Sequence, residues 1–181
     1  MPPVRLGIGN AALGLCGGMV FAALDYWHAG LAPLAARPAP GTPLYRFVVR
    51  RLIESWHIPV GVAGYYRGMV SSDAAVARRS VSRHWPRIRA LLDDGQPAPM
   101  GLVTVASANP LLLGRNHQVL AYGYTLDGPA VTLAVYDPNS GPDDRVMIRF
   151  SAAGFAHNVN IRWPVRGFFL TRYVAARPPA G

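Results

Sequence analysis

The hydrophobic pattern of the chain changes at Gly95, and this change constrains the fold more than any other feature of the sequence. Before this glycine, apolar residues recur three and four positions apart, as they do on one face of a helix. After it, short segments rich in Val, Tyr, Phe and Leu alternate with turn residues, as strands do. Helices followed by an antiparallel sheet are typical of the α+β class. The sequence therefore predicts an α+β fold with a helical N-terminal half.

The expected elements follow from spacing and from helix start and stop signals. Ser72 or Asp73 is expected to cap the third helix, and Pro86 to begin the fourth. With 181 residues, the chain has the size of one ordinary domain, and we predict a single domain over 1–181. Its helical part would cover about 10–95 and its β part about 100–175. The expected helices are 16–30, 43–57, 71–85 and 86–95, and the expected strands are 101–107, 117–125, 130–137, 145–150 and 166–174.

The charge is strongly basic, with 18 arginines, no lysine and nine carboxylates, for a net charge of +9. The tightest basic groups, "RFVVRR" and "RRSVSRHWPRIR", are typical of solvated helix faces. Aromatic residues do not alternate with them in a stripe, so we expect no nucleic-acid partner. The histidines at 57, 84 and 157 lack metal-ligand spacing with one another or with Cys16, so we expect no metal and no cofactor.

A charge-free stretch, residues 6–24, could be mistaken for a membrane span or an uncleaved signal sequence. It contains five glycines and an asparagine, and Asp25 follows it directly. A lipoprotein signal would need a small residue where Leu15 precedes Cys16. We therefore expect no membrane association and no signal peptide. The protein would be cytoplasmic or exported as an effector domain, while a membrane- or lipid-associated protein built on 6–24 stays open as an alternative.

A hairpin signal places an imidazole near a carboxylate. Asp127-Gly128 is among the strongest two-residue turn signals between strands, and the numbers of facing residues then sum to about 255. His117 would face position 137 or 138, and Asp137 stands there. Facing residues are close enough for His117 Nδ1–H to donate to the carboxylate, which would orient the ring. A surface His and Asp at a strand end is the simpler alternative.

The single cysteine, Cys16, lies in "LGLCGG" at the expected start of the first helix. A thiol in this position feels the positive end of the helix dipole, and a neighbouring imidazolium would stabilise the thiolate further. The flanking Gly17 and Gly18 would let the backbone of a substrate approach the sulfur. A lone Cys with a His and an Asp elsewhere in the chain is the pattern of a thiol hydrolase.

The order of "GLCGG", "NHQVLAYGY" and "VYDPN" resembles the papain-like cysteine peptidase superfamily, closest to the bacterial C39-like branch with its Cys-His-Asp triad. The resemblance spans about residues 10–173. It implies that Cys16 is the nucleophile, His117 the base, and Asp137 the residue that orients His117, with Asn139 as an alternative third member. It also implies an oxyanion hole formed by Asn10, where the family has glutamine, and by the backbone N–H of Cys16.

The function implied by this resemblance is hydrolysis of peptide or amide bonds through a thioacyl intermediate. A deamidase or transamidase toxin domain of the same fold stays open, because both reactions pass through the same intermediate. A catalytically inactive binding module is also open, since Asn10 replaces the usual glutamine. The partners implied are a protein or peptide substrate and an inhibitory or immunity protein. The resemblance further implies a bacterial source.

Overall fold

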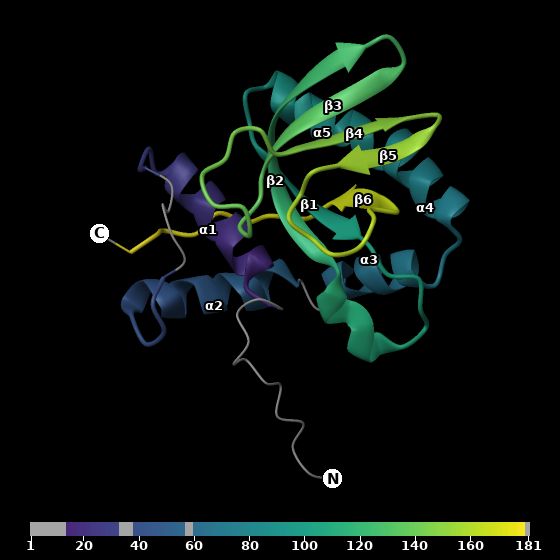
Figure 1. Cartoon of the computed structure of the whole chain (residues 1–181). Coiled ribbons are helices and arrows are strands. Elements are labelled where there is room, and N and C mark those ends of the chain that lie inside the picture. Colours follow the sequence, from purple (N-terminus) through teal and green to yellow (C-terminus); the bar gives the residue numbers. More distant parts are fainter. Residues whose placement is uncertain (1–13, 33–37, 57–59, 180–181) are drawn as a thin grey trace.

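The computed structural model describes residues 14–32, 38–56 and 60–179. Within these residues the α-helices come first and an antiparallel sheet of six strands follows, which confirms the α+β class (Figure 1). The helices are α1 (Cys16–His28), α2 (Pro43–Ser55), α3 (Val60–Met69), α4 (Asp73–Arg79) and α5 (Trp85–Asp93), with a π-helical turn η2 (Ser80–His84) and a 3-10 helix η3 (Pro110–Arg115). The strands are β1 (Ala98–Val103), β2 (His117–Asp127), β3 (Ala130–Tyr136), β4 (Met147–Ser151), β5 (Gly154–His157) and β6 (Gly167–Leu170).

Helix α1 is buried on all sides, which explains the apolar stretch of the sequence from Cys16 onward. One side packs on α2 through a cluster that includes Met19, Tyr26, Phe47 and Val48. Its other side packs on the sheet through a second cluster around Leu120. A helix enclosed in this way needs apolar residues around its whole circumference. No helix among the described residues is long and apolar enough to cross a membrane.

The strands are arranged in the order β5-β4-β3-β2-β1-β6, with every neighbouring pair antiparallel. The β2–β3 loop is one residue later than predicted, because Asp127 pairs with Ala130 and leaves Gly128 and Pro129 as the turn. Gly128 adopts a left-handed backbone with φ of 55°, which glycine tolerates well. A bulge between Ala121 and Gly123 then changes the register, so that the numbers of two paired residues sum to 257 before the bulge, counted from the turn, and to 256 beyond it.

The helices after α2 differ from the expected ones in two places. Helix α3 was not predicted, and its sequence "VGVAGYYRGM" contains three glycines, which have low helix propensity. The third and fourth expected helices form one continuous helical segment, in which η2 joins α4 to α5 and Pro86 occupies the first turn of α5. Ser72 caps α4, since its side chain accepts from the backbone N–H of Ala75.

The strands also differ from the expected ones in two places. β1 covers Ala98–Val103 rather than 101–107, and β5 (Gly154–His157) was not predicted. The main core lies between one face of the sheet and α5, where Ile88 of α5 is fully buried among strand residues such as Met100, Leu133 and Phe168. In Figure 1, α4 and α5 lie behind the sheet, whereas α1 and α2 lie at its side.

A buried ion pair joins α1, α2 and the C-terminal segment. Arg51 of α2 places its Nε 2.6 Å from Oδ2 of Asp25 in α1, and both side chains are almost fully buried. Tyr173 Oη–H and the backbone N–H of Ala176 donate to the other carboxylate oxygen, at 2.6 and 2.8 Å. Arg51 also donates to the backbone carbonyl of Val174. These contacts fix the C-terminal segment against the last turn of α1.

Candidate active site

Cys16 is the first residue of α1, and its side chain is partly buried. The position follows from the packing of the helix, since the ten residues from Gly17 to Tyr26 are all buried between α2 and the sheet. The first N–H groups of a helix have no intrahelical acceptor, and their partial positive charge favours an anion at this end. A thiolate at Cys16 would therefore lie in a favourable local field.

His117 begins β2 and is buried, and the structure brings it between Cys16 and Asp137. His117 Nε2–H donates to Asp137 Oδ1 at 2.7 Å. The nitrogen that contacts Asp137 is therefore Nε2 and not the expected Nδ1, which leaves Nδ1 as the ring nitrogen available to the Cys16 sulfur. The three side chains are therefore arranged in the order Cys16, His117, Asp137.

The pairing of His117 with Asp137 is diagonal rather than directly facing. Continuing the observed sum of 256 beyond Leu120 and Tyr136 would place position 139 opposite His117 and Asp137 opposite Val119. A diagonal pair shares one face of the sheet and remains within reach of long side chains. Position 139, and not the expected 137 or 138, is thus opposite His117, although the side chains of His117 and Asp137 meet.

Asp137 is held by four hydrogen bonds, two at each oxygen. Oδ1 accepts from His117 and from the backbone N–H of Asn139, at 2.7 and 3.0 Å. Oδ2 accepts from the hydroxyl of Ser140 and the backbone N–H of Asn160, both at 2.8 Å. The carboxyl group is 1% exposed, so these donors replace the water that it loses on folding. Its position and its ionised state are therefore both fixed by its surroundings.

The electrostatics of the three groups favour a thiolate and an imidazolium. Burial alone would raise the pKa of the Cys16 thiol, but a hydrogen bond and the positive charge of His117 outweigh burial and lower that pKa. Backbone N–H groups of Gln118 and Gly17 contribute in the same direction. For His117, burial favours the neutral ring, yet its hydrogen bonds with Asp137 and Cys16 raise its pKa to about 9.

The pKa of Asp137 supports the same arrangement. Burial by itself would raise this pKa, but the hydrogen bond and positive charge of His117, together with the N–H groups of Asn139 and Asn160, lower it from its ordinary value. The shifts of all three pKa values therefore favour a negative, a positive and a negative group in sequence. An imidazolium flanked by two anions is stabilised on both sides.

Other residues expected to belong to the site have different positions. Asn10 lies outside the described residues. Asn139 supports Asp137 through its backbone, and its side chain donates to the carbonyl of Asn160. Gly17 and Gly18 are buried: a Cβ on Gly17 would lie 2.4 Å from Ser55 Oγ, and one on Gly18 would lie 2.2 Å from the backbone oxygen of Val48. The structure therefore gives both glycines a packing role, and the expected approach of a substrate to them stays a prediction.

Two side chains near the thiol were not anticipated from the sequence. Tyr65 of α3 is buried, and its hydroxyl donates to the carbonyl of His117 at 3.0 Å. Burial, followed by the nearby negative charge of Cys16, raises the pKa of Tyr65 well above its usual range. The side chain of Gln118 is also buried, with its Oε1 beside Gly17. In the sequence, Gln118 could have been found because it follows His117 directly, whereas no sequence signal connects Tyr65 of α3 to the site.

Comparison with family models, with curated proteins and with solved structures gives no match for this chain. Among the described residues, no group of three or more His, Cys, Asp and Glu side chains is placed to hold a metal ion. The chemistry assigned to this site therefore rests on the residues themselves.

Proposed function

We propose that the protein is a papain-like cysteine hydrolase that cleaves amide bonds through a thioacyl intermediate on Cys16. The observation that supports this most is the hydrogen bond of 2.7 Å between His117 Nε2 and Asp137 Oδ1. This bond leaves the other ring nitrogen for the thiol at the start of α1. A nucleophile, a base beside it and a third group that orients the base form the general pattern of a thiol hydrolase.

In the first step, the Cys16 thiolate attacks the carbonyl carbon of an amide, and the carbonyl oxygen takes the electron pair. Collapse of this adduct re-forms the carbonyl and breaks the C–N bond. His117 Nδ1–H gives its proton to the departing nitrogen, which leaves as an amine. The products of this half-reaction are a thioester on Cys16 and a neutral His117.

In the second step, His117 acts as a base. It accepts a proton from a water molecule whose oxygen attacks the thioester carbonyl, and the C–S bond breaks to release a carboxylic acid and the thiolate. Asp137 keeps its charge throughout and stabilises the imidazolium, which gives up its proton in the first half-reaction and forms again in the second, as the third member of such triads does. Its four hydrogen bonds are consistent with a group that orients His117 and transfers no proton itself.

The negative oxygen of the adduct needs donors. The backbone N–H of Cys16, at the start of α1, is one candidate, and Asn10 is the second that the family resemblance implies. Loss of one such donor typically costs about 10² to 10³ in rate. The replacement of glutamine by Asn10 thus affects the expected efficiency of the enzyme and leaves its mechanism unchanged.

The proposal is tested by the pH dependence of Cys16 alkylation by iodoacetamide, measured by intact-protein mass spectrometry. In the parent protein, the rate should already be high at pH 6.5, because the thiolate is paired with an imidazolium whose pKa is about 9. In His117→Ala, the thiol should have a pKa of about 8.5 or higher, so the rate at pH 6.5 should fall about 100-fold. His28→Ala is the matched control, since His28 is exposed on the same helix.

Acyl transfer is then tested with p-nitrophenyl acetate. The parent protein should release p-nitrophenol in a burst of one equivalent and gain the mass of one acetyl group, whereas Cys16→Ser should do neither. Equal alkylation rates at pH 6.5 in the parent protein and His117→Ala would contradict the paired thiolate. A reactive thiolate that forms no acetyl adduct would instead support the binding module and overturn the hydrolase.

A further inference from the structure

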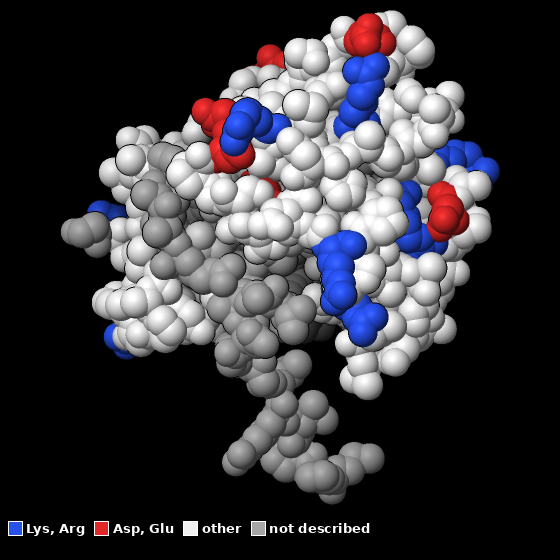
Figure 2. Space-filling view, viewed as in Figure 1, with Lys and Arg blue, Asp and Glu red and all other residues white. Residues whose placement is uncertain are grey.

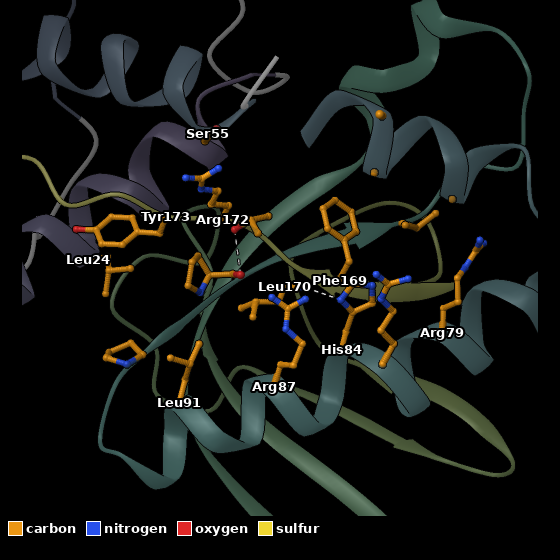
Figure 3. Close-up of a pocket in the computed structure, with 18 of the residues that line it drawn as sticks. Leu24, Ser55, Arg79, His84, Arg87, Leu91, Phe169, Leu170, Arg172 and Tyr173 are labelled. Atoms are coloured by element: carbon orange, nitrogen blue, oxygen red, sulfur yellow. Dashed lines mark hydrogen bonds between the residues drawn. The ribbon is translucent and has the colours of Figure 1, made fainter. Parts of the chain in front are cut away.

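A pocket that lies away from the triad has an unusual charge. It has a volume of about 910 Å³ and is formed between the α4–η2–α5 segment, α1, α3 and the segment that follows β6. Neither Cys16 nor His117 nor Asp137 lines it. Figure 3 shows Arg79, His84 and Arg87 on the helical side, with Arg172 and Tyr173 across from them.

Five arginines line this pocket: Arg67, Arg79, Arg83, Arg87 and Arg172. None of the described lining residues is an Asp or a Glu. Among the ion pairs of the described residues, none involves any of these five guanidinium groups. In contrast, Figure 2 shows several arginines of another face directly beside acidic side chains. The positive charge of the pocket therefore has no counter-charge within its lining.

The arrangement of these cations comes partly from the irregular helix. Arg79, Arg83 and Arg87 are four positions apart, so successive turns of the helical segment direct them to one side. Burial and neighbouring positive charges lower the pKa of two groups in the lining. Burial and the charges of Arg67 and Arg78 lower the pKa of Arg79. Burial, together with Arg87, Arg83 and Arg79, lowers the pKa of His84 to about 4.

The floor of the pocket is apolar and partly aromatic. It includes Leu24, Leu91, Val103, Phe169 and Leu170. The backbone N–H of Leu170 donates to His84 Nδ1 at 3.3 Å, which leaves Nε2 of this ring available to a ligand. Pockets of roughly 300–1,000 Å³ that combine apolar walls with a few polar groups are typical of small-molecule sites. The space exceeds what a single phosphate group would fill.

We propose that this pocket binds a phosphorylated small molecule that carries several phosphate groups on an aromatic or apolar body. The arginines would hold the phosphates, because the planar guanidinium donates two parallel hydrogen bonds to phosphate oxygens. The apolar floor would cover the rest of the molecule. The site is independent of the proposed hydrolase chemistry, since the two share no lining side chain.

The test uses isothermal titration calorimetry at 150 mM NaCl without divalent cations, on Cys16→Ala protein so that the triad is inactive. The probes are ATP, which has phosphates and an aromatic body, sodium tripolyphosphate, which has the charge alone, and adenosine, which has the body alone. We expect ATP to bind with a Kd below 1 mM and at least tenfold more tightly than either of the other probes. One equivalent of ATP should bind per chain.

Two exposed arginines of the pocket offer a variant that should fold normally. Arg83→Gln combined with Arg87→Gln removes two charges from the lining, and ATP should then bind at least tenfold more weakly. The matched control is Arg46→Gln with Arg162→Gln, which removes two charges from exposed positions outside the lining. Its ATP affinity should remain within twofold of the parent. Circular dichroism melting curves establish that all three proteins are folded.

His84 provides an independent readout, because its ring lies among the arginines. Its pKa, measured by NMR titration of the imidazole C–H signal, should rise in the presence of saturating ATP as the phosphates offset the neighbouring charges. Absence of ATP binding at 1 mM would overturn the proposal. So would equal losses in both double variants, or tighter binding of a 12-nucleotide single-stranded RNA that both double variants weaken equally, since these results indicate diffuse attraction to net charge.

Discussion

Replacement of Asp137 by Asn tests whether the negative charge of the carboxylate, rather than the shape of the side chain, organises the site. Asp137 accepts four hydrogen bonds at two oxygens, and an asparagine offers only one oxygen. If the amide oxygen takes the place of Oδ1, the Ser140 hydroxyl can rotate and accept from the new NH₂ group. The backbone N–H of Asn160 cannot rotate and would face another donor.

The expected loss of stability follows from these contacts. One buried donor without an acceptor costs about 1–3 kcal/mol. The bond to His117 also changes from charge-assisted to neutral, and such bonds differ about twofold in strength, which adds about 1 kcal/mol. We therefore expect the free energy of unfolding of Asp137→Asn to fall by about 2–4 kcal/mol in urea titrations. Asp144→Asn, an exposed neighbour, should change it by less than about 0.5 kcal/mol.

The same variant should change the reactivity of the thiol. Without the carboxylate, the pKa of His117 falls from about 9 and the imidazolium no longer holds the Cys16 pKa down as strongly. The alkylation rate at pH 6.5 should therefore decrease, and the rise of the rate should move to higher pH. A variant that loses less than about 1 kcal/mol and keeps the parent pH profile would refute the role given to Asp137.

Two further substitutions test the packing that positions α1. Gly18→Ala places a Cβ 2.2 Å from the backbone oxygen of Val48, so α1 and α2 must separate. We expect the free energy of unfolding in urea to fall by about 1–3 kcal/mol. Gly123→Ala is the control, since its Cβ would lie 4.0 Å from its nearest neighbour. Arg51→Met leaves the buried Asp25 without its partner and should cost about 3–5 kcal/mol, whereas Arg50→Met, at an exposed pair, should cost less than about 1 kcal/mol. If a test variant and its control lose equal stability, the packing argument for that pair is contradicted.

The sequence predicts the class of fold because hydrophobic spacing and turn residues are local signals. The change at Gly95 separates helices from strands correctly, and the hairpin signal places β2 beside β3. It fails where the signal is ambiguous: the turn is Gly128-Pro129, and the bulge near Tyr122 moves the register back by one residue. Bulges depend on cross-strand packing and therefore leave little trace in one strand alone.

Helix α3 shows a second limit of local reasoning. Its glycines suggest a breaker, yet Gly64 and Gly68 allow the helix to approach the sheet closely. A Cβ on Gly68 would lie 2.7 Å from a methyl group of Val103, and one on Gly64 would lie 3.3 Å from the ring of Phe169. The low helix propensity of glycine is offset by tertiary contact. Tyr65 reaches His117 only because the helix is this close.

The candidate triad was predictable in its residues and less so in its geometry. Residue type, a turn signal and the resemblance together select Cys16, His117 and Asp137. The ring nitrogen that faces Asp137 and the donors from Ser140 and Asn160 depend on loops after β3 and β5 that have no periodic pattern. The arginine-lined pocket was likewise invisible, since its cations come from α3, from the α4–α5 segment and from the residues after β6.

Helix α1 connects these features, because its surroundings determine where the thiol lies. Close approach to α2 at Gly18 fixes one side of its first turn, and the cluster around Leu120 fixes the other. The Asp25–Arg51 pair then restrains its last turn, together with the C-terminal segment. With both sides of the helix held, Cys16 cannot move relative to His117 without displacing α2 or β2. A stiff helix of this kind preserves the alignment of thiol and imidazole, and alignment is the property that gives intramolecular reactions most of their rate advantage.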